Sequence, residues 1–206
     1  MKLVFATNNK HKLEEIRELL NRNFELLSLA DIGCTVEIPE DQDTLEGNAS
    51  QKSHYIYENY GYSCFADDTG LEVEALNNAP GVHSARYAGP QRNARDNTQK
   101  LLSRLHKIKN RNARFRTVIS LVIDGKEILF EGVVNGTILE HEKGEQGFGY
   151  DPVFQPDGYT LSFAEMDLNE KNKISHRGHA FRKMTDYLGS AEKKVMFWIV
   201  DDLSDI

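Results

Sequence analysis

The chain has few cysteines and no long apolar segment. Cys34 and Cys64 are the only two cysteines among its 206 residues, and they lack the spacing of a metal site or of a disulfide framework. We expect both to be buried free thiols in a reducing compartment. The sequence has no apolar run of 18 residues and no signal-peptide core after Met1. These absences predict a cytoplasmic protein with no membrane partner.

Basic residues are fewer than acidic ones, 25 against 32. The formal net charge is -7, which argues against a protein that binds nucleic acid by neutralising many phosphates. A small anionic substrate remains compatible with this charge, because a local group of lysines and arginines can hold phosphates inside an acidic molecule. The sequence therefore directs attention to individual basic side chains.

Repeats and low-complexity linkers are absent as well, so we expect one domain over residues 1–206. The hydrophobic pattern predicts an α/β fold with a mixed central β-sheet flanked by helices, arranged as two lobes around a cleft. Predicted strands are 2–6, 24–29, 63–66, 71–76, 113–123 and 126–138, with a hairpin turn at Asp124-Gly125. Predicted helical segments are 7–23, 44–60, 96–108 and 176–189.

The segment "TNNKHK" places polar groups between the first strand and the first helix. Ligands favour that location in open α/β sheets, and free helix N–H groups favour anions. Thr7, Asn9 and Lys12 are therefore candidates to hold a phosphate. Helix capping by asparagine, beside a solvated lysine, explains the same residues.

Adjacent carboxylates occur in "FADDTGL", where Asp67 and Asp68 follow an apolar run. Mg²⁺ takes oxygen ligands, and its charge relieves repulsion between neighbouring carboxylates. One aspartate would bind the metal while the other faces the opposite way and polarises water. A turn at "DDTG" is the alternative. Glu40 lies in a second acidic cluster before a helix, where it could instead complement the helix dipole.

Aromatic and basic groups fill two later segments. In "GFGYDPVF", Phe148 and Tyr150 could form a platform for a flat base or could be core residues under a turn. In "NEKNKISHRGH", Lys171, His176 and Arg177 are donors that suit phosphate and carbonyl oxygens. His176 and His179 could alternatively bind a metal, although zinc needs three or four ligands.

Together and in this order, the motifs resemble those of the inosine triphosphate pyrophosphatase family, and specifically of its bacterial branch. The resemblance is carried by "TNNKHK", "FADDTGLEVEALNNAPGVHSARYAG", "GFGYDPVF" and "EKNKISHRGHA", and it spans roughly residues 1–190. It implies a homodimer with the active site between two lobes. It further implies Mg²⁺-dependent hydrolysis of non-standard purine nucleoside triphosphates (dITP, ITP and XTP) to the monophosphate and pyrophosphate.

The resemblance also implies roles for individual residues. Asp68 is the expected general base, and Glu40, Asp67 and Asp68 are the expected metal ligands. Donors from His176 or Arg177 would pair with the 6-oxo group of hypoxanthine or xanthine. The expected substrate-binding residues are Thr7, Asn8, Asn9, Lys12, Lys52, Thr69, Phe148, Gly149, Tyr150, Asp151, Lys171, Ser175, His176 and Arg177.

Two other functions remain open at this point. A Maf-type pyrophosphatase would act on pyrimidine or modified nucleotides, although that class lacks this arrangement of "GFGYDP" and "SHR". A nucleotide-binding regulatory module without catalysis would gain nothing from carboxylates near phosphates unless a metal were present.

The segment 190–206 is an extension past the last matched motif. Its apolar "VMFWIV" predicts packing on the parent domain or, second, a dimer contact.

Overall fold

The computed structural model describes residues 1–19 and 24–202, and residues 191–202 only as backbone. The strands in this part of the chain are β1 (Lys2–Phe5), β2 (Glu25–Leu27), β3 (Cys64–Val73), β4 (Ala79–Gly81), β5 (Asn112–Ile123), β6 (Lys126–Ile138) and β7 (Phe154–Pro156). The α-helices are α1 (Lys10–Leu19), α2 (Leu45–Tyr60), α3 (Ala94–Arg104), α4 (Leu168–Ile174) and α5 (His176–Asp202). Short 3₁₀ turns include η2 (Glu74–Leu76), η3 (Ser84–Arg86), η4 (Asp151–Val153) and η5 (Phe163–Glu165).

All seven strands join one mixed sheet. Its order is β2-β1-β3-β5-β6-β7, and β4 pairs with β3 outside that path. Strand β1 runs parallel to β2 and β3, whereas the remaining pairs are antiparallel. The predicted mixed α/β fold is therefore confirmed.

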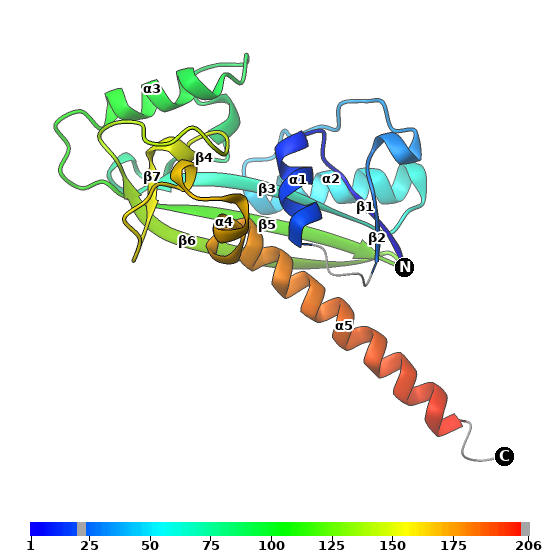
Figure 1. Ribbon diagram of the computed structural model, residues 1–206. Helices are drawn as coiled ribbons and strands as arrows, with labels where there is room; N and C mark the ends of the chain where they lie inside the picture. The colour runs from blue at the N-terminus through cyan, green and yellow to red at the C-terminus, as the bar shows by residue number, and fades with distance from the viewer. Residues whose placement is uncertain (20–23, 203–206) are drawn as a thin grey trace.

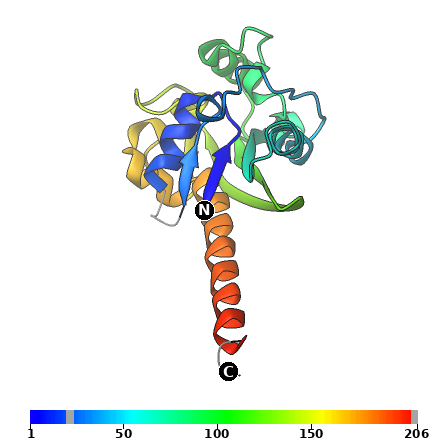
Figure 2. The same cartoon turned by 90° about the vertical axis from the view of Figure 1, so that its right-hand side faces the viewer.

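Two lobes share the long strands β3, β5 and β6 (Figure 1). At one end, β1, β2, α1 and α2 form the first lobe; at the other, α3, β4, β7 and η4 form the second. In the first lobe, α1 and α5 pack on one sheet face around Phe65, and α2 packs on the other around Ala66. The layers on either side of the sheet are visible end-on in Figure 2. In the second lobe, Phe115 and Phe154 centre a separate core.

The predicted turn at "DDTG" is wrong, because β3 continues through it without a break. Every residue from Cys64 to Val73 pairs with β5, including Asp67 with Ile119 and Asp68 with Val118. Gly70 does not turn the chain. A Cβ atom on Gly70 would lie 2.6 Å from the carbonyl oxygen of Gly81, so glycine here permits the close approach of β4. The strand ends at Val73, and residues 74–76 form η2 rather than more strand.

Local sequence signals placed both ends of α2 and the start of α5 to within one residue. Thr44 caps α2 by accepting a hydrogen bond from the Gly47 amide, and Gly61 ends that helix at a φ of 71°. The predicted hairpin between β5 and β6 is confirmed, with φ of 49° at Asp124 and 73° at Gly125. Helix α3 begins two residues earlier and ends four earlier than predicted. Helix α4 and the short strands β4 and β7 were missed.

The last helix extends well beyond its predicted end at residue 189. Its ribbon leaves the sheet and points away from both lobes as it approaches Asp202 (Figures 1 and 2). The side chains of the apolar segment 195–200 lie outside the described residues, so the packing of this segment stays a prediction.

No helix in the described part of the chain combines the length and apolar character that a membrane crossing needs. Cys34 and Cys64 are both buried free thiols, as predicted.

Candidate active site

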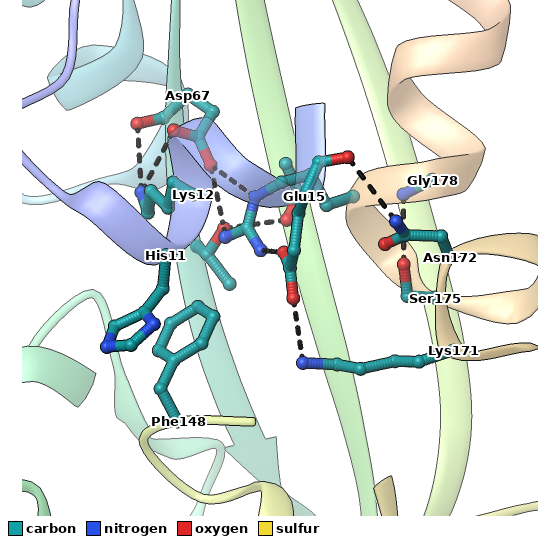
Figure 3. A network of polar contacts seen from close by, with 12 residues as sticks. His11, Lys12, Glu15, Asp67, Phe148, Lys171, Asn172, Ser175 and Gly178 are labelled. Carbon is teal, nitrogen blue, oxygen red and sulfur yellow. Dashed lines mark hydrogen bonds and ion pairs between the residues drawn. The ribbon is translucent and has the colours of Figure 1, made fainter. Parts of the chain in front are cut away.

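A cleft of about 780 Å³ lies between the lobes. The β1–α1 turn, the segment before α2, strand β3, the segment before η4 and the α4–α5 junction all contribute to its walls. Most of the residues predicted to bind substrate line it: Thr7, Asn8, Asn9, Lys12, Lys52, Thr69, Phe148, Gly149, Tyr150, Asp151, Lys171, His176 and Arg177. Ser175 is buried behind this wall, where its hydroxyl accepts a hydrogen bond from the Gly178 amide (Figure 3).

The β1–α1 turn shows that Asn9 acts as a helix cap. Its Oδ1 accepts hydrogen bonds from the amides of His11 (3.0 Å) and Lys12 (3.3 Å). Thr7 Oγ1 in turn accepts from the Asn9 amide at 3.2 Å. The capping interpretation is therefore correct for the Asn9 side chain. Phosphate contact by Thr7, Asn8 and Asn9 stays a prediction, supported by their position on the cleft wall.

Asp67 is buried among cations and does not line the cleft. Its Oδ1 lies 3.0 Å from Lys12 Nζ, and its Oδ2 lies 3.1 Å from Arg177 Nε (Figure 3). Burial alone would raise the pKa of Asp67, but Lys12 and Arg177 outweigh burial and hold that pKa well below its usual range. Asp67 is therefore a permanent anion that fixes two basic side chains.

Asp68 points to the opposite face of the sheet, because successive side chains of a strand alternate. There its Oδ2 accepts a hydrogen bond from Asn48 Nδ2 at 3.1 Å, and its Oδ1 lies 3.7 Å from Lys52 Nζ. Burial raises the pKa of Asp68, and the opposing effect of Lys52 and Lys12 does not cancel it. Of the two aspartates, Asp68 is the one suited to accept a proton.

Glu40 meets Asp68, and not Asp67, at Lys52. The Lys52 ammonium lies 2.5 Å from Glu40 Oε1 as well as close to Asp68. The expected set of Glu40 with Asp67 around one ion is thus not the arrangement observed, since Asp67 faces the other side of the sheet. Within the described residues no group of three or more His, Cys, Asp or Glu side chains forms a ready metal site. A carboxylate pair nevertheless fits Mg²⁺, which commonly takes one or two carboxylates plus water and phosphate oxygens.

Glu15 is a site residue that the sequence reasoning missed. It is buried on α1, where it pairs with Lys171 Nζ at 2.8 Å and with Arg177 (Figure 3). Lys171 also lies 2.6 Å from Asp151. The helical spacing could have indicated Glu15, because this residue follows Lys12 by three positions and so lies on the same face of α1.

This network holds two basic residues that were expected to bind substrate. Arg177 donates to Glu15, Asp67 and Thr69, which uses three of the five N–H groups of its guanidinium. Lys171 is held between two buried carboxylates. Both residues link α1 to the α4–α5 junction. Because both also line the cleft, substrate contact by Lys171 and Arg177 stays a prediction.

His176 lines the cleft and has one ring nitrogen without a partner among the described residues. The buried imidazole stacks on Phe115 with ring centroids 4.6 Å apart. Burial, reinforced by Arg177 and Lys171, lowers its pKa well below the usual value. Its Nδ1 is buried and has no hydrogen-bond partner in the part of the chain that the structure describes. A buried polar atom without a partner is costly unless a ligand supplies one.

The aromatic loop divides into core and cleft positions. Tyr150 is buried and donates its hydroxyl hydrogen bond to the Ser84 carbonyl at 2.9 Å. Asp151 is also buried and accepts a hydrogen bond from the Phe148 amide at 2.8 Å. Both rings line the cleft, but Phe148 is the less buried of the two and stacks on His11. The platform interpretation therefore suits Phe148, and the core interpretation suits Tyr150.

Comparison with known proteins gives a consistent result. A model of the Ham1 family matches residues 3–187. A protein named dITP/XTP pyrophosphatase from Flavobacterium psychrophilum is 56% identical over 187 residues, covering 91% of this chain and 98% of the relative. One of the same name from Thermoanaerobacter sp. is 46% identical over 191 residues, covering 91% and 96%. The solved Ham1 protein of Staphylococcus aureus superposes with a TM-score of 0.85 at 33% identity, covering 93% of this chain and 100% of its own.

Proposed function

Because this chain belongs to the Ham1 family, we propose that it hydrolyses the non-standard purine nucleotides dITP, ITP and XTP to the monophosphate and pyrophosphate. Its relatives are named dITP/XTP pyrophosphatases. One observation carries the proposal. A single cleft is lined by a carboxylate suited to accept a proton, Asp68, and by the imidazole of His176, whose buried Nδ1 has no hydrogen-bond partner among the described residues. The first suits attack by water, and the second suits recognition of a base.

Glu40 and Asp68 are the proposed ligands of a Mg²⁺ ion. Both carboxylates contact the Lys52 ammonium, which compensates their negative charges. A bound Mg²⁺ would neutralise charge on the phosphates and polarise them towards attack. Asp67 is not included, because its carboxylate is committed to Lys12 and Arg177 on the other sheet face.

Asp68 then acts as the general base. It takes a proton from a water molecule, and the water oxygen bonds to the α-phosphorus while the bond from that phosphorus to the bridging oxygen breaks. Pyrophosphate leaves with the negative charge that Lys12 and Lys52 stabilise from the cleft wall. Asn48 holds the Asp68 carboxylate in orientation through its 3.1 Å hydrogen bond.

His176 is the proposed reader of the base. A neutral imidazole with its proton on Nδ1 donates a hydrogen bond to the 6-oxo group of hypoxanthine or xanthine. Adenine carries a 6-amino donor at that position, so the buried N–H would remain unpaired. Mispairing of a buried polar group can discriminate by about 10⁴-fold or more. The proposed reading uses His176, because Arg177 already donates three of its five N–H groups to Glu15, Asp67 and Thr69.

Pyrophosphate release from a panel of nucleotides tests the proposal. With Mg²⁺ present, we expect fast turnover of ITP, dITP and XTP and slow turnover of ATP, GTP, dTTP and UTP. Preference for the pyrimidine nucleotides would instead indicate a Maf-type activity. Tight nucleotide binding without turnover of any member would indicate a regulatory module.

We also propose that the protein is a cytoplasmic homodimer. The resemblance to the inosine triphosphate pyrophosphatase family supports the dimer. The cytoplasmic location rests on the reducing environment that two free cysteines favour. Sedimentation equilibrium of the full chain would give twice the mass of the 23.4 kDa chain if the dimer is correct, and the single mass if it is wrong.

A further inference from the structure

His11 and Phe148 form an aromatic contact across the cleft. His11 lies in the first turn of α1 in the first lobe, and Phe148 lies just before η4 in the second. Their ring centroids are 5.3 Å apart and their planes are only 11° from parallel (Figure 3). Both residues line the cleft. The two rings therefore stack directly on each other across the cleft.

One side of Phe148 is closed by fixed cations. Lys171 Nζ lies 5.0 Å and Arg177 Cζ 5.7 Å from the centre of the Phe148 ring. Figure 3 shows the Lys171 ammonium and the His11 ring on opposite sides of Phe148. Both cations are buried and held by carboxylates, including Glu15. Moving them would leave buried charges unpaired, which is strongly unfavourable, so a base cannot enter from that side.

The His11 side is the side that can open. The His11 side chain is 60% exposed, and its one ion pair among the described residues is a 3.6 Å contact with the exposed Glu14. Its backbone amide is fixed by the Asn9 cap at 3.0 Å. The imidazole can thus swing about its side-chain torsions while its attachment point stays beside the cleft. Admitting a flat ring requires it to move by about one ring thickness, ~3.5 Å.

We propose that His11 is a substrate-binding residue, and that the purine base enters between His11 and Phe148 and is stacked on both faces. This inference rests on the proposed function, because it concerns the nucleotide in the same cleft. One aromatic contact is lost when the rings separate and two are gained with the base. Stacking contributes affinity without reading hydrogen-bonding groups, since every base has a flat face. His11 therefore sets how tightly purines bind, while His176 sets which purines are accepted.

The test compares His11→Ala and His11→Phe with the unchanged chain, and His106→Ala serves as the control. His106 is an exposed histidine that does not line the cleft. Kinetics would be measured for dITP and dATP, and inhibition constants for inosine, which lacks phosphates, and for inorganic tripolyphosphate, which lacks a base. We expect His11→Ala to raise the KM for dITP and the inhibition constant of inosine about three- to tenfold, the range of an aromatic stack. The inhibition constant of tripolyphosphate and the ratio of dITP to dATP activity should not change.

The phenylalanine variant separates stacking from other roles of histidine. His11→Phe should restore inosine inhibition to within about twofold of the unchanged chain, because the stack needs only a flat ring. Tighter inosine binding by His11→Ala would mean that His11 competes with the base, and the proposal would be wrong. Equal inosine binding by all variants would also overturn it. Failure of the unchanged chain to hydrolyse dITP would contradict the proposed function instead, and inosine and tripolyphosphate binding, followed by calorimetry, would still test His11.

Discussion

At the scale of single residues, the site depends on two neighbouring aspartates with different surroundings. Asp67 and Asp68 alternate across the sheet, so one meets Lys12 and Arg177 while the other meets Asn48 and Lys52. Opposite orientation of the pair was predictable from the sequence. The resemblance also named Asp68 as the expected base. The ion pairs of Asp67 were not predictable, because its two cations come from residues 55 and 110 positions away in the chain.

The two aspartates should separate chemistry from stability when each is replaced by asparagine. Asp68→Asn removes the proposed base and should lower kcat by about 10²- to 10⁴-fold, with little change in the free energy of unfolding. Asp67→Asn leaves Lys12 and Arg177 short of a buried anion and should lower that free energy by about 3 kcal/mol. Urea unfolding and dITP turnover measure the two effects. Near-normal turnover by Asp68→Asn would remove Asp68 from the base role.

Base selection should depend on the His176 nitrogen rather than on its ring shape. His176→Phe keeps a flat ring against Phe115 but removes the buried Nδ1. We expect the ratio of kcat/KM for dITP to that for dATP to fall at least about tenfold, because the donor that distinguishes the bases is gone. An unchanged ratio would show that another group reads the 6-position. Ser103→Ala, an exposed change on α3, is a suitable control.

At the scale of elements, the buried ion network joins α1 to the α4–α5 junction. Glu15 contributes from α1, Lys171 from α4 and Arg177 from α5. The caps and periodicity of α2 were readable from sequence because a helix signals its ends locally. Helix α4 was missed because five of its seven residues are polar and its two buried residues, Lys171 and Asn172, are among them, so it shows no apolar periodicity. Its stability comes from partners that are distant in the sequence.

Glu15→Gln should weaken the fold much more than the same change at its neighbour. Loss of the Glu15 charge leaves Lys171 and Arg177 undercompensated in a buried setting, which should cost about 3 kcal/mol. Glu14 is exposed, so Glu14→Gln should change the free energy of unfolding by less than about 0.5 kcal/mol. Denaturant unfolding of both variants at neutral pH provides the comparison. Equal stability of the two would show that the network contributes nothing to the fold.

The effect of Glu15 on stability should also depend on pH. Burial alone would raise the pKa of Glu15, but Arg177 and Lys171 outweigh it and lower that pKa below the ordinary value of 4.5. A lowered folded-state pKa gives stability that is present above pH 4.5 and is lost as the pH falls through the folded value. The difference in stability between the unchanged chain and Glu15→Gln should therefore shrink on acidification below pH 4.5. A difference that stays constant there would contradict this account.

At the scale of the whole molecule, hydrophobic periodicity predicted the layers well, because helices and long strands must bury one face. Periodicity could not predict how individual side chains are arranged at the cleft. Phe148 and Tyr150 are close together in one short motif and both line the cleft, yet Phe148 stacks on His11 while the mostly buried Tyr150 donates a hydrogen bond to the Ser84 carbonyl. Which aromatic faces outward is decided by a hydrogen-bond acceptor 66 positions earlier in the chain, and periodicity carries no such information.

The long strands that cross both lobes have a consequence for how the protein unfolds. Strand β3 pairs with β5 from Cys64 to Val73, and β5 pairs with β6 from Asn112 to Ile123. Neither lobe can lose its structure without breaking these shared ladders, so we expect one cooperative calorimetric transition. Deuterium should enter the β3 amides near Asp67 only when the whole chain opens, and more slowly than those of α3. Although the proposed substrate site lies between two lobes, thermal and chemical denaturation would act on a single cooperative unit.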